Sequence, residues 1–259
     1  MPKTDLFLEK PLMNGAGTLG FSPDTNEFPF INHFGAFVTN PISWTARTPA
    51  KGTRYIPFSG GFLLHTGYPN PGINTVVRVH ARRWARSPLP VIAHILAQDA
   101  HTVARMVQKL EDLEGLIAVE IGLPPGIDPT LVYELTLAAT GELAVIVRLP
   151  FELGTLPGSN ESLLDAVNQA GANAISLAPP RGQLPDRQGT NVAGRLYGPS
   201  IFPQAFSILK RLAGSNLPII ISGGIYKPTD IDTMLVGGAT AIQLDAVLWR
   251  GINDLGLIG

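Results

Sequence analysis

The chain has 259 residues, of which 45% are apolar and 15% charged, and its formal net charge is −1. This length supports a large core, and the near-neutral charge gives no electrostatic footprint for nucleic acid or for an anionic membrane. The absence of cysteine excludes disulfides and thiolate catalysis within the chain. No signal peptide or membrane-spanning apolar run is evident, which favours a cytoplasmic protein. No spacing of His, Asp and Glu residues indicates a metal site.

Eight short apolar runs predict the strands of a parallel sheet that is covered on both faces, because polar and apolar residues do not alternate in them. They lie at 12–15, 36–40, 91–96, 117–123, 144–149, 174–178, 218–222 and 241–245. Amphipathic segments between them predict helices, for example 99–113, and 160–171 with Asn160 as its cap. Eight such units without a break in composition predict a single-domain α/β protein, a (β/α)8 TIM barrel over residues 1–259.

Three segments depart from this regular pattern. Residues 50–72 predict a hairpin-bearing insertion after the second strand, and 179–199 predict a polar loop, rich in Gly and Pro, after the sixth. Loops that follow strands lie on the catalytic face of a barrel, so both segments are expected at its mouth. The basic run 78–86 is interpreted as the solvated face of a helix, with a phosphate-binding patch as the less favoured alternative.

Several motifs, in chain order, resemble those of dihydroorotate dehydrogenases. They are LMNGAGTLGF (12–21), GAFVTNPIS (35–43), TGYPNPG (66–72), VEIGLPP (119–125), VIVRLP (145–150), GRLYGPSIFPQAFSILKRL (194–212) and PIIISGGIYKPTDIDTMLVGGATAIQL (218–244). The resemblance covers nearly the whole chain and is best to the class without N-terminal membrane helices. It implies a barrel that binds FMN and transfers hydride from dihydroorotate to the flavin.

The resemblance also implies which positions would hold the cofactor: Ala16, Gly17, Asn40, Arg148, Gly223, Gly224 and Asp245. Many residues depart from the family pattern. Lysines of that pattern fall on Asn40 and Arg148, asparagines on Leu64, Gly122 and Ala178, a serine on Ala16, and the base-bearing cysteine on Pro124 or Pro125. Since proline is neither a base nor a donor, dihydroorotate oxidation is expected to be absent.

Asp245 and Ala246 stand where the resemblance implies Gly and Thr beside the flavin phosphate. At a separation of about 5 Å and an effective dielectric of about 20, the carboxylate would repel each phosphate charge by about 3 kcal/mol. Ordinary FMN binding is therefore not expected. Gly223 and Gly224 are either a surviving phosphate site or only a tight strand-to-helix turn.

Four polar residues, Glu120, Arg148, His94 and Asp245, are expected near strand ends at the mouth. They form either an inherited site neutralised by internal ion pairs or a new polar pocket, in which Arg148 holds an anion and Glu120 or Asp245 handles a proton. His94 or His65 could be a base, although a lone histidine is more often structural. Arg148, Glu120 and His94 are thus the catalytic candidates.

The expected function is that of a divergent family member that binds a small molecule of unknown identity at its mouth. One alternative is an active FMN oxidoreductase that acts on a CH–CH group of another substrate. Another is a non-catalytic interaction or structural barrel. A homo-oligomer, in the first place a dimer, is expected, with neither a nucleic acid nor a membrane as partner.

Overall fold

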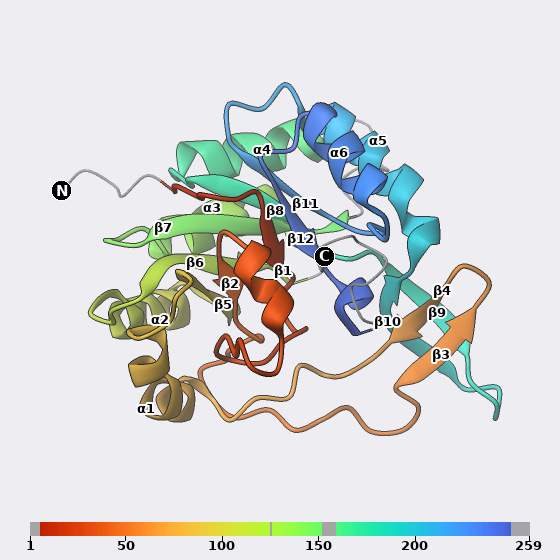
Figure 1. The fold of residues 1–259 in the computed structure, drawn as a ribbon, viewed down its shortest axis with the longest axis horizontal. Helices are drawn as coiled ribbons and strands as arrows, with labels where there is room; N and C mark the ends of the chain where they lie inside the picture. Colours follow the sequence, from red (N-terminus) through yellow and green to blue (C-terminus); the bar gives the residue numbers. More distant parts are fainter. Residues whose placement is uncertain (1–5, 125, 152–158, 250–259) are drawn as a thin grey trace.

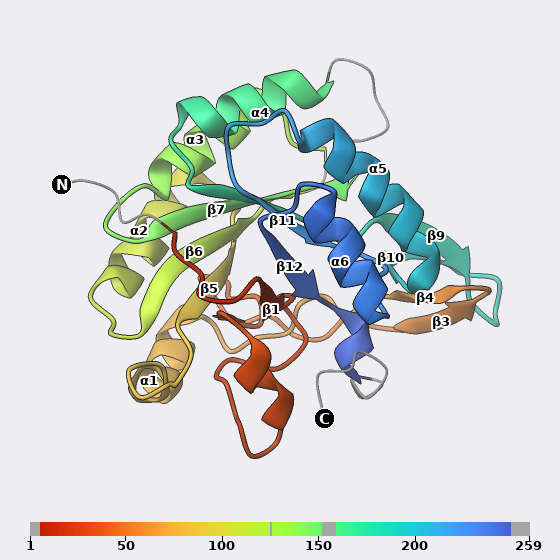
Figure 2. The same ribbon diagram turned by 45° about the horizontal axis from the view of Figure 1, so that its top comes forward.

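The computed structural model describes residues 6–124, 126–151 and 159–249. Eight parallel strands form one sheet: β1 (Leu12–Asn14), β2 (Phe37–Val38), β5 (Val91–Leu96), β6 (Leu116–Gly122), β7 (Ala144–Leu149), β8 (Ala174–Leu177), β11 (Ile219–Ser222) and β12 (Ala241–Leu244). Their order is β1-β12-β11-β8-β7-β6-β5-β2. All eight predicted strands are confirmed. The sheet curls into a nearly closed barrel with helices outside it (Figures 1 and 2).

The barrel closes between β1 and β2, where the backbone offers only one bridge, Met13 with Ala36. A side chain completes the seam. The amide of Asn14 accepts from the backbone nitrogen of Val38 at 2.9 Å and donates to the carbonyl oxygen of the same residue at 2.7 Å. Because Asn14 is fully buried, its amide replaces two ladder hydrogen bonds that the short strands do not make.

The helices follow the strands and cover the outer face of the barrel. They are α1 (Ile73–Trp84), α2 (Ala100–Glu111), α3 (Pro129–Ala138), α4 (Ser159–Gln169), α5 (Phe202–Leu212) and α6 (Pro228–Val236), with 3-10 turns η1 (Pro29–His33), η3 (Pro199–Ile201) and η4 (Ala246–Trp249). Asp99 caps α2 and Asp128 caps α3, each by accepting from a backbone nitrogen three residues on. The expected Asn160 cap is wrong, because α4 already includes Ser159.

Arginines of the basic run 78–86, on α1 and just beyond it, are exposed, which agrees with the interpretation of that run as a solvated face. No helix in the described part of the chain is long and apolar enough to cross a membrane.

The insertion after β2 forms the expected hairpin, β3 (Tyr55–Phe58) and β4 (Gly61–Leu64). The expectation of a polar loop rich in Gly and Pro at 179–199 is wrong. That segment forms a second hairpin, β9 (Arg181–Pro185) and β10 (Asn191–Tyr197), and β10 pairs with β4. The result is a four-stranded antiparallel sheet, β3-β4-β10-β9, at one side of the barrel (Figure 1). Loop composition hides this pairing because the partner strand lies more than a hundred residues earlier in the chain.

The barrel interior has two layers. The lower layer is apolar and includes Ile92, Ala118, Ile146, Ala174, Ile220 and Ala241. Two residues further along the same strands stand His94, Glu120, Arg148, Ser176, Ser222 and Gln243, all buried. Since strand side chains alternate with a period of two, these polar residues point to the same interior, one step nearer the mouth. We call them the polar layer.

Candidate functional site

Glu120 is the centre of the polar layer. It is fully buried, and its carboxylate has four donors on four other strands. Oε2 accepts from His94 Nδ1 at 2.6 Å and lies 3.3 Å from a terminal nitrogen of Arg148. Oε1 accepts from Ser176 Oγ at 2.6 Å and from Gln243 Nε2 at 2.7 Å. A buried carboxylate with this many donors is stabilised in its charged form.

Opposing effects set the protonation states of this cluster. Burial acts to raise the pKa of Glu120, but the Arg148 charge and the hydrogen bonds from His94 and Ser176 outweigh it and hold the pKa well below its usual range. Burial lowers the pKa of His94 below its usual value, and the adjacent Glu120 only partly offsets this. His94 is therefore mainly neutral at neutral pH, with its Nδ1 proton directed to Glu120 and its Nε2 lone pair available.

Gly122 makes room for the His94 ring. A β-carbon at this position would lie 2.7 Å from His94 Nε2, closer than real side chains approach. The histidine and the glycine are thus a matched pair on neighbouring strands, where Gly122 lies two residues beyond Glu120, the register partner of His94. This gives a structural reason for glycine at a position where the family resemblance implies asparagine.

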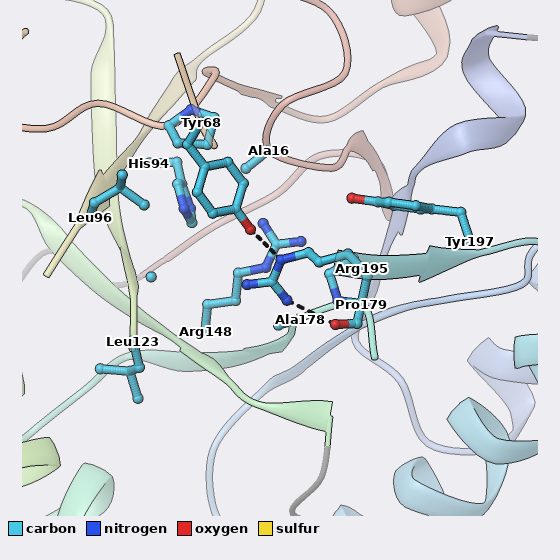
Figure 3. A pocket seen from close by; sticks show the side chains of 12 residues that line it. Ala16, Tyr68, His94, Leu96, Leu123, Arg148, Ala178, Pro179, Arg195 and Tyr197 are labelled. Atoms are coloured by element: carbon cyan, nitrogen blue, oxygen red, sulfur yellow. Dashed lines mark hydrogen bonds between the residues drawn. The ribbon is translucent and has the colours of Figure 1, made fainter. Parts of the chain in front are cut away.

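Above the polar layer lies a pocket, called here the inner pocket, with an empty volume of about 420 Å³. His94 and Arg148 form its floor, and Ala16, Tyr68, Arg195 and Tyr197 contribute to its walls (Figure 3). Arg195 donates to the carbonyl oxygen of Pro179 at 2.8 Å and to the hydroxyl of Tyr68. Both arginines extend toward the middle of the pocket (Figure 3).

Arg148 is 93% buried, and its Nε has no hydrogen-bond partner among the described residues. An unpaired buried donor of this kind is unfavourable unless something else accepts from it. The guanidinium also lies beside the open space of the inner pocket. The arrangement can therefore bind a group with acceptor oxygens.

Asp245 follows directly after β12 and is buried. Its Oδ1 accepts from the backbone nitrogen of Ala246 at 2.6 Å, at the start of η4. Burial raises the pKa of Asp245 to about 6, although the Ala246 hydrogen bond and the Arg148 charge act in the opposite direction. Its carboxylate thus already occupies a backbone donor at the end of the last strand.

The other expected cofactor positions have roles within the fold. Gly223 and Gly224 have φ of 109° and 74°, and a β-carbon on Gly224 would overlap the backbone nitrogen of Phe202. This packing accounts for both glycines as a tight turn against α5. The side chain of Asn40 accepts from the backbone nitrogen of Gly20 at 3.1 Å and so holds the loop after β1.

The structure brings together Arg148, Glu120 and His94, and places Asp245 within electrostatic reach of Arg148. Gly17, His65 and Leu64 line a neighbouring chamber, whereas Ala16 lines both spaces and Ala178 lines the inner pocket. Pro124 is half-buried, and Pro125 lies outside the described residues. Within the described chain, no group of three or more His, Asp or Glu residues could hold a metal ion.

Sequence reasoning missed five residues of this site: Tyr68, Ser176, Arg195, Tyr197 and Gln243. Ser176 and Gln243 carried a usable signal, because each is a single polar residue inside an otherwise apolar strand. Arg195 and Tyr197 could not be placed while their segment was taken for a loop. Their position depends on the pairing of β10 with β4.

A sequence model described as dihydroorotate dehydrogenase matches residues 4–144, which is more than half of the chain. The chain belongs to the dihydroorotate dehydrogenase family. It is 26% identical to the catalytic subunit of an NAD(+)-dependent dihydroorotate dehydrogenase B from Trichlorobacter lovleyi, over 92% of this chain and 84% of that protein. A subunit of the same name from Alkaliphilus oremlandii is 28% identical, over 92% and 83% of the two chains.

A crystal structure of dihydroorotate dehydrogenase from Eimeria tenella in complex with ferulenol matches the fold, with a TM-score of 0.76. The match covers 93% of this chain and 77% of that one at 13% identity. At this identity the likeness supports the barrel and says nothing of the site. The family and the (β/α)8 architecture expected from the sequence are therefore confirmed.

Proposed function

We propose that this member of the dihydroorotate dehydrogenase family holds a small anion in the inner pocket, and that it has lost normal FMN binding and dihydroorotate oxidation. The observation that carries the proposal is the Glu120-centred network. One buried carboxylate orients His94 and Arg148 so that a neutral imidazole nitrogen and an incompletely paired guanidinium face the same small space. A cation and a base side by side suit an acidic ligand.

The residues at the flavin positions do not fit FMN. A phosphate at the end of β12 would need backbone donors, and the Asp245 carboxylate already accepts from one of them at 2.6 Å. A buried carboxylate also repels a phosphate dianion. We take the carboxylate of Asp245 as an internal replacement for the missing phosphate.

His94 is the group that we assign to proton transfer. Glu120 accepts a hydrogen bond from the Nδ1–H group of His94 and so fixes the tautomer, which leaves Nε2 to accept a proton from a bound ligand. The lowered pKa keeps the imidazole neutral, and hence competent as a base, at neutral pH. The base would then come from β5, not from the loop after β6 where the proline stands.

The second candidate is an FMN-dependent oxidoreductase with an altered substrate. Family membership favours it, together with the glycine pair at 223–224, whose positive φ values would also suit a phosphate loop. Measuring orotate formation from dihydroorotate, with added FMN and a dye acceptor, tests whether the protein has kept the oxidation of dihydroorotate. Turnover near the usual enzymatic scale of about 1 per second would contradict the loss of activity.

Calorimetric titration with orotate, a small planar carboxylate, tests the anion site. The wild type should bind it, and Arg148→Met should weaken binding by at least about tenfold, because a charge-assisted hydrogen bond contributes about 1.5–3 kcal/mol. Arg148→Lys keeps the charge beside Glu120, and its affinity for orotate should lie between those of the wild type and Arg148→Met. Arg82→Gln on the exposed face of α1 removes the same charge far from the pocket and should leave the affinity unchanged.

Equal affinity in the wild type and Arg148→Met would remove Arg148 from the site. Failure of the wild type to bind orotate, benzoate and oxalate alike would overturn the anion proposal itself. Circular dichroism on each variant separates lost binding from lost folding, since Arg148→Met leaves Glu120 without its cationic partner.

A further inference from the structure

We propose that the chamber beside the inner pocket is a phosphate-binding site formed by Arg47, Arg181 and Arg195. This chamber, called here the sheet chamber, has an empty volume of about 740 Å³ and lies against β4, β9 and β10. It shares Ala16, Tyr68, Arg195 and Tyr197 with the inner pocket. The phosphate proposal rests on Arg47, Arg181 and Arg195, whereas the proposed function rests on Glu120, His94 and Arg148, so neither depends on the other.

The charge of the sheet chamber is one-sided. Three arginines and His65 line it, and none of its described lining residues is Asp or Glu. A concave surface lined by charges of one sign raises the local concentration of ions of the opposite sign. The net charge of the whole chain is only −1, so this local excess of positive charge is not a consequence of composition.

Two of the arginines are forced together by the sheet. Arg195 of β10 lies directly opposite Arg181 of β9 in the antiparallel register, so both side chains leave the same face. Like charges in this position are unfavourable to the fold. Leu64 of β4 lies opposite Arg195 on its other side and gives it no counter-charge. Both side chains line the sheet chamber, so an anion bound there would be attracted by both.

The hydrogen bonds of Arg47 and Arg195 go to neutral acceptors. Arg47 Nε donates to the carbonyl oxygen of Gly67 at 3.2 Å. Arg195 donates to the Tyr68 hydroxyl and to the carbonyl oxygen of Pro179. A guanidinium has five N–H donors, and these bonds use one of Arg47 and two of Arg195. The bonds fix the directions of both side chains without neutralising their charges.

A phosphate group matches this arrangement better than a single carboxylate does. It carries a charge of about −1.5 to −2 at pH 7 and presents three strong acceptor oxygens, which suits a chamber lined by three arginines. The ligand is inorganic phosphate or the phosphate end of a larger molecule. This site is distinct from the glycine turn at 223–224, which packs against α5.

Titration calorimetry with inorganic phosphate at low salt tests the proposal. Arg47→Gln and Arg181→Gln should each weaken phosphate binding by at least about tenfold relative to the wild type. The matched control is Arg187→Gln, an exposed arginine in the β9–β10 turn that does not line the chamber. Its affinity should stay within about twofold of the wild type, because an exposed distant charge is largely screened.

The same variants with phenyl phosphate show which source of phosphate the chamber takes. If the wild type binds phenyl phosphate more tightly than inorganic phosphate, and Arg181→Gln loses this difference, the ligand is an organic phosphate. Equal affinities for the two ligands support the free ion. Equal losses in all three variants, Arg187→Gln included, would show only general charge attraction and would overturn the site. Absence of phosphate binding by the wild type at about 10 mM, near the weak limit of useful affinities, would overturn it as well.

Discussion

The two layers of the barrel interior lie one step apart on the same strands, yet they are built on opposite principles. In the apolar layer, Ala118 is surrounded by other small and branched side chains of the neighbouring strands. Two residues on, Glu120 is equally buried but has four hydrogen-bond donors. A charged side chain is thus kept in the barrel interior where donors from four other strands contact it.

The two layers also differ in how their parts depend on one another. Apolar contacts are many, small and non-directional, so one altered side chain disturbs the layer locally. The polar layer is centred on the Glu120 carboxylate, and His94, Arg148, Ser176 and Gln243 all direct donors to it. Loss of Glu120 would leave a buried cation and three polar side chains without their partner.

The largest expected effect is therefore that of Glu120→Ala. Breaking a buried ion pair by removing one partner destabilises a protein by about 3–5 kcal/mol, because the remaining charge is uncompensated. The free energy of unfolding, measured by urea denaturation, should fall by this amount. Glu120→Gln keeps the shape and one acceptor oxygen but loses the charge and turns the other acceptor into a donor. It should be less destabilised than the alanine variant, and it gives a measurable protein if that variant does not fold.

The control for Glu120→Ala belongs to the apolar layer. Ile146→Val removes one methylene group from a fully buried position two residues before Arg148. It should lower the free energy of unfolding by only about 0.5–1.5 kcal/mol. A Glu120→Ala effect no larger than that of Ile146→Val would contradict the view that the polar layer depends on its central carboxylate.

A smaller effect is expected from Asp245, and its sign depends on pH. The folded-state pKa of about 6 lies above the ordinary value of 3.8, so between these pH values the folded protein binds more protons than the unfolded chain. The free energy of unfolding should therefore fall as pH rises through this window, by up to about 3 kcal/mol. Asp245→Asn removes this contribution.

The matching measurement is urea denaturation of the wild type and Asp245→Asn at pH 4.5 and at pH 7.5. The stability of Asp245→Asn relative to the wild type should be greater at pH 7.5 than at pH 4.5. The lowered pKa of His94 makes the free energy of unfolding rise with pH over part of this range. This contribution is present in both proteins, so it cancels in their difference. A pH-independent difference would place the Asp245 carboxylate in a more polar environment than the structure does.

The sequence was sufficient to predict the barrel, because apolar runs alternating with amphipathic segments are local signals. It was also sufficient to predict that Glu120, His94 and Arg148 belong to one site, because the ends of parallel strands meet at the mouth of a barrel. It could not predict that Glu120 collects Ser176 and Gln243, because that depends on the strand register around the barrel. It could not predict the β4–β10 pairing either, and with it the location of Arg195 at the pocket.

We propose that the Asp245 carboxylate takes the place of the flavin phosphate, and an FMN titration tests this directly. FMN is titrated into the wild type and into the double variant Asp245→Gly with Ala246→Thr, with quenching of flavin fluorescence as the signal. The double variant removes a buried negative charge, frees a backbone donor and adds a hydroxyl. We predict weak or undetectable binding to the wild type and an affinity at least about tenfold higher in the double variant, with a larger gain at low salt. Tight FMN binding to the wild type, unchanged by the double substitution, would contradict the account.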